Sequence, residues 1–419
     1  MSSVTPQQEL NAALSAHSLH KRGLSALNAY RAFPGKPDGH HASQVVNALV
    51  RSGLVAEATE FWRGLGPLKS VHAGTALMKG YSLTFDAVDN AKALLREMEA
   101  SKKFKPNART LNAFLRCLQW NLGGAAVPSS LVRRVGDRSS LGYAVTAKCC
   151  LGLDCAAEFS ELRKERDDIA AKACLDVIRM KLLKGEPVAD EVELALDLTT
   201  KEIEGRHDGD ARYRKHRMEY VRAEVEALRS FKGDPTGKQD RFVTDQAVST
   251  EAGKTTHVEL GSGSGKWIAD RAKQDISGNS VWFAVEQRAD RVWEGYCSHV
   301  LGGAEGGKVV NVWCDAVTFL AGCAAVDNIY VNHPEPDTQG DVETEASHML
   351  GLECLKLCFE KLKDGGRWVM VTDNLIYGRK VGRDIARLMQ EYGLRHDQRA
   401  EEDSELKRKE RWQGKGGGE

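Results

Sequence analysis

Five residues, Gly261-Ser-Gly-Ser-Gly265, separate two segments of different pattern, and their spacing is typical of a ligand-binding turn. Residues 255–260 read as a short buried strand, and residues 266–273 read as the start of a helix. A glycine-rich turn between a strand and a helix lets backbone approach a ligand closely and points free N–H groups at it. The spacing is not the G-x-G-x-x-G of dinucleotide-binding folds, and no phosphate-loop Gly-Lys-Ser/Thr follows. The glycine spacing is therefore compatible with two alternatives, a ligand-binding turn or a tight turn that binds nothing.

Four more apolar runs follow this loop, and each ends in polar or acidic residues: 281–286 with Glu286, 309–315 with Asp315, 326–332 with Asn332, and 366–372 with Thr372 before Asp373. Helical patterns separate all five runs, so we expect a mostly parallel sheet with ligands bound outside the carboxyl ends of its strands. Glu259, Glu286 and Asp315 would then share one rim. Three acids at one rim suit ribose hydroxyls, an amino group and a positive charge, and they would repel the phosphates of NAD or ATP.

The motifs Glu259-Leu-Gly-Ser-Gly-Ser-Gly265, Val285-Glu286, Cys314-Asp315-Ala316, Asn332-His-Pro-Glu-Pro336 and Thr372-Asp373 occur in the order seen in one enzyme family. Residues 250–395 resemble the tRNA (guanine-N7-)methyltransferases, which are S-adenosylmethionine-dependent enzymes of the Rossmann-like class. The Asn-x-Pro-acid-Pro motif is more particular to this family than the glycine loop is. The resemblance implies formation of 7-methylguanosine in tRNA.

The resemblance also implies roles for single residues. Those implied to bind the cofactor are Glu259, Gly261, Gly263 and Gly265 at its methionine end, Glu286 at its ribose, Asp315 at its adenine, and Asn332. Glu335 would face the target guanine, with Asp373 as a second catalytic acid and Thr372 on the substrate side. No metal ion is implied.

Three positions depart from the family pattern. Glu335 stands where the family has Asp, Asp337 stands where it has Trp, and residues 338–345 are acidic where the family is basic. Lys and Arg contacts to phosphates supply most nonspecific affinity for nucleic acid, so their loss would weaken RNA binding. One alternative is therefore a non-catalytic RNA-binding or scaffold protein, and another is a methyltransferase acting on a small molecule or a protein. His-Pro-Glu-Pro could also be a plain turn after a strand.

Residues 38–205 show helical patterns that recur roughly every 30 residues, which predicts an all-α helical-hairpin solenoid. They resemble pentatricopeptide repeats most clearly at Phe104-Lys-Pro-Asn-Ala-Arg-Thr-Leu-Asn-Ala-Phe-Leu-Arg-Cys117, which implies an RNA-binding arm. The candidate base-facing positions Ala48, Ala76 and Ala113 lack hydrogen-bonding side chains, so no target sequence can be read. A protein-binding tetratricopeptide-like array or a helical bundle remains open.

Residues 206–253 read as a basic helix and a linker. Arg212, Arg214, Lys215 and Arg217 could contact RNA phosphates near the catalytic rim, or they could form a solvated face. We place the Rossmann-like methyltransferase domain at residues 254–395 and a charged tail at 396–419.

The 419 residues carry no formal net charge, and their ten cysteines show no zinc-binding spacing. They are expected to be buried thiols of a reducing compartment. No apolar run is long enough to span a membrane. Residues 1–37 could be a transit peptide or the first helix, which leaves mitochondrion, chloroplast and cytoplasm open. A partner subunit is also an open possibility.

Overall fold

The computed structural model describes residues 5–121, 127–204, 211–229, 231, 242–243, 253–275, 277–301, 309–334 and 349–392. It divides into two compact units, Met1–Val371 and Thr372–Glu419. The second unit contains helix α19 (Leu375–Tyr392). All other elements given below belong to the first unit.

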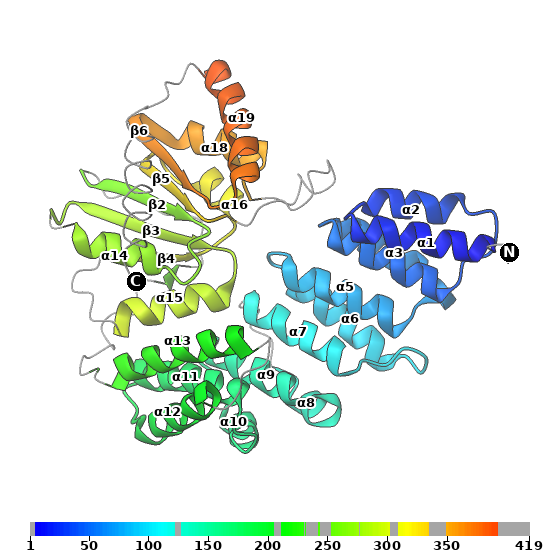
Figure 1. Ribbon diagram of the computed structural model, residues 1–419, viewed down its shortest axis with the longest axis horizontal. Helices are drawn as coiled ribbons and strands as arrows, with labels where there is room; N and C mark the ends of the chain where they lie inside the picture. The colour runs from blue at the N-terminus through cyan, green and yellow to red at the C-terminus, as the bar shows by residue number, and fades with distance from the viewer. Residues whose placement is uncertain are drawn as a thin grey trace, which may run out of the picture. The chain divides into compact units, whose positions relative to one another are not determined.

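The N-terminal half of the first unit consists of helical hairpins (Figure 1). The hairpins are α1 (Pro6–Leu19) with α2 (Gly23–Ala32), α3 (Gly39–Arg51) with α4 (Val55–Gly64), α5 (Val71–Leu83) with α6 (Val88–Ala100), α7 (Ala108–Trp120) with α8 (Ser129–Val135), α9 (Arg138–Cys150) with α10 (Ala156–Leu162), and α11 (Asp168–Leu183) with α12 (Ala189–Glu204). A short 3₁₀ turn, Gly66–Leu68, follows α4. The first helix of each hairpin packs on the first helix of the next, and α13 (Ala211–Arg229) closes the row against α11 and α12. The predicted solenoid is confirmed.

A repeated polar residue fixes where the first helix of each hairpin begins. The capping residues are Thr5, Asp38, Ser70, Asn107, Asp137 and Asp167. In each case the side chain accepts a hydrogen bond from a backbone N–H of the first turn, which would otherwise lack a partner. At α7, for example, Asn107 Oδ1 accepts from Thr110 N at 3.0 Å.

The C-terminal half of the first unit is built on a six-stranded sheet in which every strand pair is parallel. The strands are β1 (Phe242–Val243), β2 (Thr255–Leu260), β3 (Ser280–Glu286), β4 (Val309–Trp313), β5 (Val326–Asn332) and β6 (Leu362–Val371), in the order β1-β4-β3-β2-β5-β6. The five predicted strands are β2 to β6. The edge strand β1 was missed, because two residues are too short to show a period.

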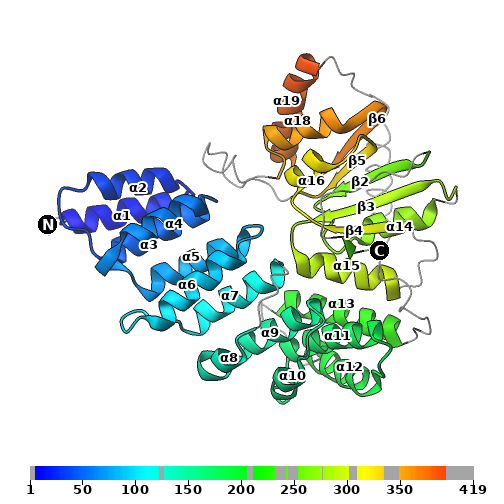
Figure 2. The same cartoon turned by 180° about the vertical axis from the view of Figure 1, so that it is seen from behind.

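Helices cover both faces of this sheet, as Figures 1 and 2 show from opposite sides. Helices α14 (Lys266–Gln274) and α15 (Ala289–Leu301) lie on one face, and α16 (Ala316–Gly322) and α18 (Leu352–Lys361) lie on the other. Side chains of β3 alternate between the faces, since Trp282 packs with Ile268 of α14 while Phe283 lies 6.3 Å from Phe319 of α16. This is the doubly wound arrangement expected of the Rossmann-like class.

Helix α15 belongs to the core of both halves. It packs on β3 and β4 on one side and on α7, α9 and α11 on the other. Trp293, Tyr296, Cys297, Val300 and Leu301 share a single apolar cluster with the last hairpins. A helix that is buried nearly all round must lie between two packing layers. The helical array is therefore fused to the sheet through a continuous core.

A buried ionic network joins α15 to the array. Arg179 of α11 is only 1% exposed, and its guanidinium lies 2.9 Å from Glu224 of α13 and 3.6 Å from Glu294 of α15. Burial alone would raise the pKa of Glu294, but Lys172, Arg179 and Arg291 outweigh it and hold that pKa at about 2. Glu294 also accepts a hydrogen bond from Tyr220 Oη at 2.8 Å. The acid therefore stays ionised inside the junction.

Replacing Arg179 by Leu should destabilise the protein by about 3–5 kcal/mol, because it removes one of the cations that face buried Glu294 and leaves Glu224 without its 2.9 Å partner. Arg222 provides the matched control, since it forms an exposed i,i+4 pair with Glu226 at 3.0 Å. Arg222→Leu should cost less than about 1 kcal/mol. Urea unfolding followed by circular dichroism measures both losses. Equal losses would show that the buried network does not hold the junction.

Candidate functional site

The crevice between β2 and β5 holds a carboxylate that lacks a full set of partners. These neighbouring strands mark the point where the chain switches direction across the sheet, and ligands of such folds bind at this point. Asn332 Nδ2, at the end of β5, donates a 2.7 Å hydrogen bond to Glu259 Oε1, near the end of β2. Glu259 is only 2% exposed, and Oε2 has no hydrogen-bond partner within the described part of the chain.

Burial raises the pKa of Glu259 to about 7. The hydrogen bond from Asn332 opposes this rise, and so does the backbone N–H of Ile268, which lies near the carboxylate without the geometry of a hydrogen bond. The nearby Glu286 carboxylate adds to the rise. An acid that is half-protonated near neutral pH in an apolar setting gains from any donor or positive charge placed against it. The site is therefore suited to an ammonium or other cationic group.

Glu286 ties the glycine loop to the neighbouring turn. Its Oε2 accepts from Gly263 N at 3.0 Å, and its Oε1 accepts from Arg288 N at 2.9 Å. Burial raises its pKa, although the hydrogen bonds from Arg288 and Gly263 oppose the shift. A carboxylate oxygen has two lone pairs, so Glu286 can accept further hydrogen bonds from ligand hydroxyls.

The glycine loop requires its glycines. Gly261, Gly263 and Gly265 have φ values of 67°, 57° and 66°, in the left-handed region that other residues avoid. A Cβ at Gly261 would also lie 3.1 Å from Met349 Sδ, and one at Gly265 would lie 3.2 Å from the His299 ring. Gly265 directly precedes α14, so the loop delivers the N-terminus of that helix to the crevice.

Three residues that sequence reasoning missed support the loop from α15 and β4. His299 Nε2 donates to the Gly265 carbonyl at 3.2 Å, and Asn311 Nδ2 donates to His299 Nδ1 at 3.1 Å. A Cβ at Gly295 would lie 2.9 Å from the Ser264 carbonyl oxygen. For His299 and Asn311 the only sequence signal was a polar residue inside an apolar segment, which does not say what the residue contacts.

Asp315 is the third acid of this edge. It follows β4, two residues after Trp313, which is the register partner of Glu286. Its Oδ1 accepts from Thr318 N at 2.9 Å and so caps α16. Glu259, Glu286 and Asp315 thus lie at the carboxyl ends of three adjacent strands, and their roles stay predictions.

The other predicted site residues are not assembled around this edge by the described structure. Glu335 lies outside the described residues, while Thr372 and Asp373 belong to the second unit, so the predicted catalytic pair stays a prediction. Next to Glu335, His333 has a φ of 48° and donates its backbone N–H to the Val371 carbonyl at 2.7 Å. Strained backbone of this kind clusters at functional sites.

The predicted RNA-contacting cations lie on α13. The side chain of Arg212 is outside the described part, Lys215 is exposed, and Arg217 lies 3.7 Å from Asp168. Arg214 is partly exposed. None of these observations tests a role in RNA binding.

The helical array touches the rim loops of the sheet at three places. Gln119 Nε2 donates to Asp290 at 2.9 Å, the Arg288 guanidinium lies 4.1 Å from the centre of the Trp120 ring, and Phe85 lies 5.1 Å from Trp313. Arg288 and Asp290 follow Glu286 directly, and Trp313 precedes Asp315. The array therefore meets the loops that carry two of the three rim acids.

The expected base-facing positions are partly wrong. Ala48 and Ala113 are buried in the core of the array, so neither can face a base. Polar side chains nearby join consecutive first helices instead, for example Asn112 Nδ2 to Asp137 at 3.2 Å and Ser43 to Ser70 at 2.9 Å. The repeat pattern predicted where the helices lie in the sequence, but it did not predict which side of each helix faces the core.

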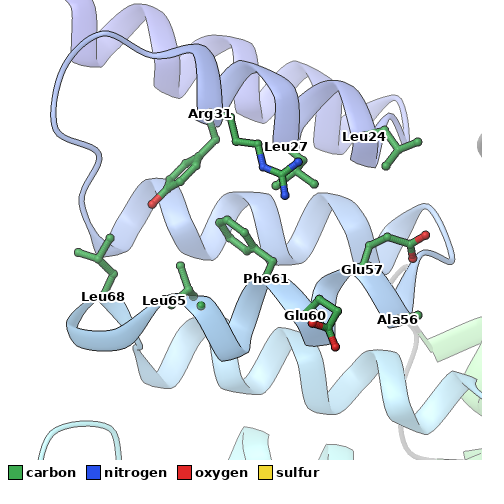
Figure 3. A pocket seen from close by; sticks show the side chains of 11 residues that line it. Leu24, Leu27, Arg31, Ala56, Glu57, Glu60, Phe61, Leu65 and Leu68 are labelled. Atoms are coloured by element: carbon green, nitrogen blue, oxygen red, sulfur yellow. The ribbon is translucent and has the colours of Figure 1, made fainter.

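A separate groove lies between α2 and α4 (Figure 3). Leu24, Leu27 and Phe61 line it together with Arg31 and Glu60, and none of the predicted site residues borders it. In the described ranges no group of His, Cys, Asp and Glu is arranged to hold a metal ion. No helix among the described residues combines the length and apolarity needed to cross a membrane. All ten cysteines are free thiols.

Comparisons with known proteins give little support for any specific activity. No protein-family model matches the chain, and no curated protein does. One solved structure that resembles it is the methyltransferase subunit of a type I restriction-modification system from Streptococcus thermophilus, at 14% identity over 87% of this chain and 74% of that one. The TM-score is 0.24, so this likeness carries no argument about fold or function.

Replacing Glu259 by Gln should stabilise the protein at high pH. Between the ordinary pKa of 4.5 and the folded value of about 7, the folded state keeps a proton that the unfolded chain releases, so stability falls as the pH rises. The variant, which can still accept from Asn332, lacks this loss of about 3 kcal/mol. Urea unfolding should show Glu259→Gln more stable than the parent at pH 8 and equal to it at pH 4. A variant that is less stable at pH 8 would contradict the shifted pKa.

Proposed function

We propose that the sheet half is an S-adenosylmethionine-dependent methyltransferase that acts on N7 of guanosine in tRNA, with the helical array as its RNA-binding arm. The observation that carries the cofactor assignment is the buried Glu259 carboxylate, with one oxygen unpartnered, beside a left-handed glycine loop. The guanosine and tRNA assignments rest on the resemblance at Asn332 to Pro336.

The residues present fit this cofactor. Glu259 and the loop from Gly261 to Gly265 would hold its amino acid end, since its ammonium group suits the unpartnered Oε2. Glu286 would accept hydrogen bonds from its ribose hydroxyls, and Asp315 would take the adenine edge. Asn332 orients Glu259 through its 2.7 Å hydrogen bond. When bound, the cofactor supplies an electrophilic methyl group on a sulfonium.

Little acid–base chemistry is required of the protein. Guanine N7 carries a free lone pair at neutral pH, so the contribution of the chain is positioning and charge. Glu335 would accept hydrogen bonds from N1 and the exocyclic amine of the guanine, and its carboxylate would offset positive charge on the purine. Asp373 would act from the substrate side. Burial of Glu259 keeps water from competing for its carboxylate.

The arm is assigned to RNA because polar side chains join several of its neighbouring first helices. Hydrogen bonds join Asn47 to Ser18, Asn112 to Asp137 and Arg116 to Tyr143, each across neighbouring first helices. Polar side chains along the first helices of a solenoid suit a linear polar ligand. The contacts of Gln119 and Trp120 with Asp290 and Arg288 would bring that ligand to the rim.

The test is transfer of label from methyl-labelled S-adenosylmethionine to unmodified tRNA, followed by digestion to nucleosides. We expect label in 7-methylguanosine, and a loss of at least tenfold in Glu335→Gln, because this change removes the charge and keeps the shape. Binding of the cofactor itself should be retained in that variant.

Glu360→Gln, on α18, is the matched control and should leave turnover unchanged. Label in another nucleoside would overturn the N7 assignment. Cofactor binding without any labelled RNA would refute tRNA as substrate. Absence of cofactor binding would favour the non-catalytic RNA-binding or scaffold alternative.

A further inference from the structure

The last turn of α7 contacts an ion pair that belongs to the edge of the sheet. The pair lies in residues 286–290, the rim segment, which joins β3 to α15. Arg288 Nη2 lies 2.9 Å from Asp290 Oδ2. The Arg288 guanidinium lies 4.1 Å from the centre of the Trp120 ring, and Gln119 Nε2 donates to Asp290 Oδ2 at 2.9 Å. Each member of the pair is therefore held by one side chain of α7.

The last turn of α7 is itself fixed. Asn121, which ends the helix, is only 3% exposed. Its Nδ2 donates to the Cys117 carbonyl at 3.1 Å, and its Oδ1 accepts from Asp86 N at 2.9 Å. The Arg116 guanidinium also lies 5.5 Å from the Trp120 ring centre. The ring is thus a fixed surface that already has cationic neighbours.

A second contact reaches the rim segment from the turn between α5 and α6. The ring centre of Phe85 lies 5.1 Å from that of Trp313, which ends β4. Trp313 Nε1 donates to the carbonyl of Gln287 at 3.0 Å. Gln287 stands between Glu286 and Arg288 in the sequence. The array therefore holds the rim segment directly through α7 and indirectly through Trp313.

The rim segment in turn holds the carboxylate of Glu286. Arg288 N donates to Glu286 Oε1 at 2.9 Å, and Gly263 N donates to Glu286 Oε2 at 3.0 Å. One contact of the carboxylate thus comes from the rim segment and the other from the glycine loop. Groups that contact a ligand keep their geometry only when the residues behind them are held. A displaced Arg288 backbone would release one side of the carboxylate.

We propose that Trp120 and Gln119 are positioning residues for Glu286, so that cofactor binding at the rim depends on the helical array. The inference rests on the proposed function, in which Glu286 binds the ribose of the cofactor, and it deepens that function by making the array part of the cofactor site. An Arg guanidinium stacks on a Trp ring in a defined plane, which a Lys or an aliphatic contact would not impose. An arm that only bound substrate would leave cofactor affinity unchanged when these contacts were removed.

The test measures two quantities on the full chain. One is the affinity for labelled S-adenosylmethionine, and the other is the hydrogen-exchange rate of the Gly263 and Arg288 amides, which both donate to Glu286. Trp120→Leu removes the ring beside Arg288, and Gln119→Leu removes the neighbouring hydrogen bond. Each should weaken cofactor binding about three- to tenfold, which corresponds to one misplaced hydrogen bond. Each should also speed exchange of both amides several-fold, as read by mass spectrometry of overlapping peptides.

Two further variants separate positioning from general loosening. Trp120→Phe keeps a ring beside Arg288 and should lose less affinity than Trp120→Leu. Tyr220→Phe is the matched control, because it removes a hydrogen bond elsewhere in the same junction, from Tyr220 Oη to Glu294 at 2.8 Å. It should leave both quantities at the values of the parent. Urea midpoints show whether each variant is folded, and Gln119→Leu decides should Trp120→Leu fail to fold.

Unchanged affinity and exchange in both α7 variants would overturn the proposal, as would changes of equal size in Tyr220→Phe. Faster exchange with unchanged cofactor affinity would overturn the dependence of binding on the array. No binding of S-adenosylmethionine by the parent would refute the proposed function and its cofactor. The exchange rates, which need no cofactor, would then still show whether α7 orients Glu286.

Discussion

Helix α15 is the element on which the other parts depend, because it is buried between the sheet and the helical array. Its own acid, Glu294, is kept ionised within that layer by Lys172, Arg179 and Arg291. A buried ion pair contributes little net stability, but loss of one partner leaves the other charge buried and uncompensated. The same helix carries His299 and Gly295 under the glycine loop. The same helix thus both packs against the array and supports the glycine loop.

At the rim, in contrast to the junction, a buried carboxylate is not stabilised by a cation of the described residues. Glu259 is buried with one unpartnered oxygen, and its pKa of about 7 shows that ionisation is costly there. Left-handed glycines and the left-handed His333 add local constraint beside it. Groups arranged at the expense of stability are expected where a ligand completes the hydrogen bonding. The concentration of such features at one crevice is the physical basis of the functional assignment.

The sequence predicted those features of the structure that leave a periodic pattern or a polar residue at the end of a strand. The solenoid, strands β2 to β6 and the acids at three strand ends follow from apolar runs and turn residues. The sequence did not show β1, which is two residues long, or the rotation of the first helices, so Ala48 and Ala113 were wrongly placed facing a ligand. It also missed the contacts of Trp120 with Arg288 and of His299 with Gly265, because these depend on tertiary packing between distant segments.

Equilibrium dialysis of labelled S-adenosylmethionine against the full chain, with ATP as competitor, tests the central claim most directly. The acids at the rim favour a cationic ligand and repel phosphates. We predict saturable binding that tightens as the pH rises through 7, because Glu259 becomes ionised, and that ATP does not displace. Displacement by ATP, or binding that does not change with pH, would contradict the account.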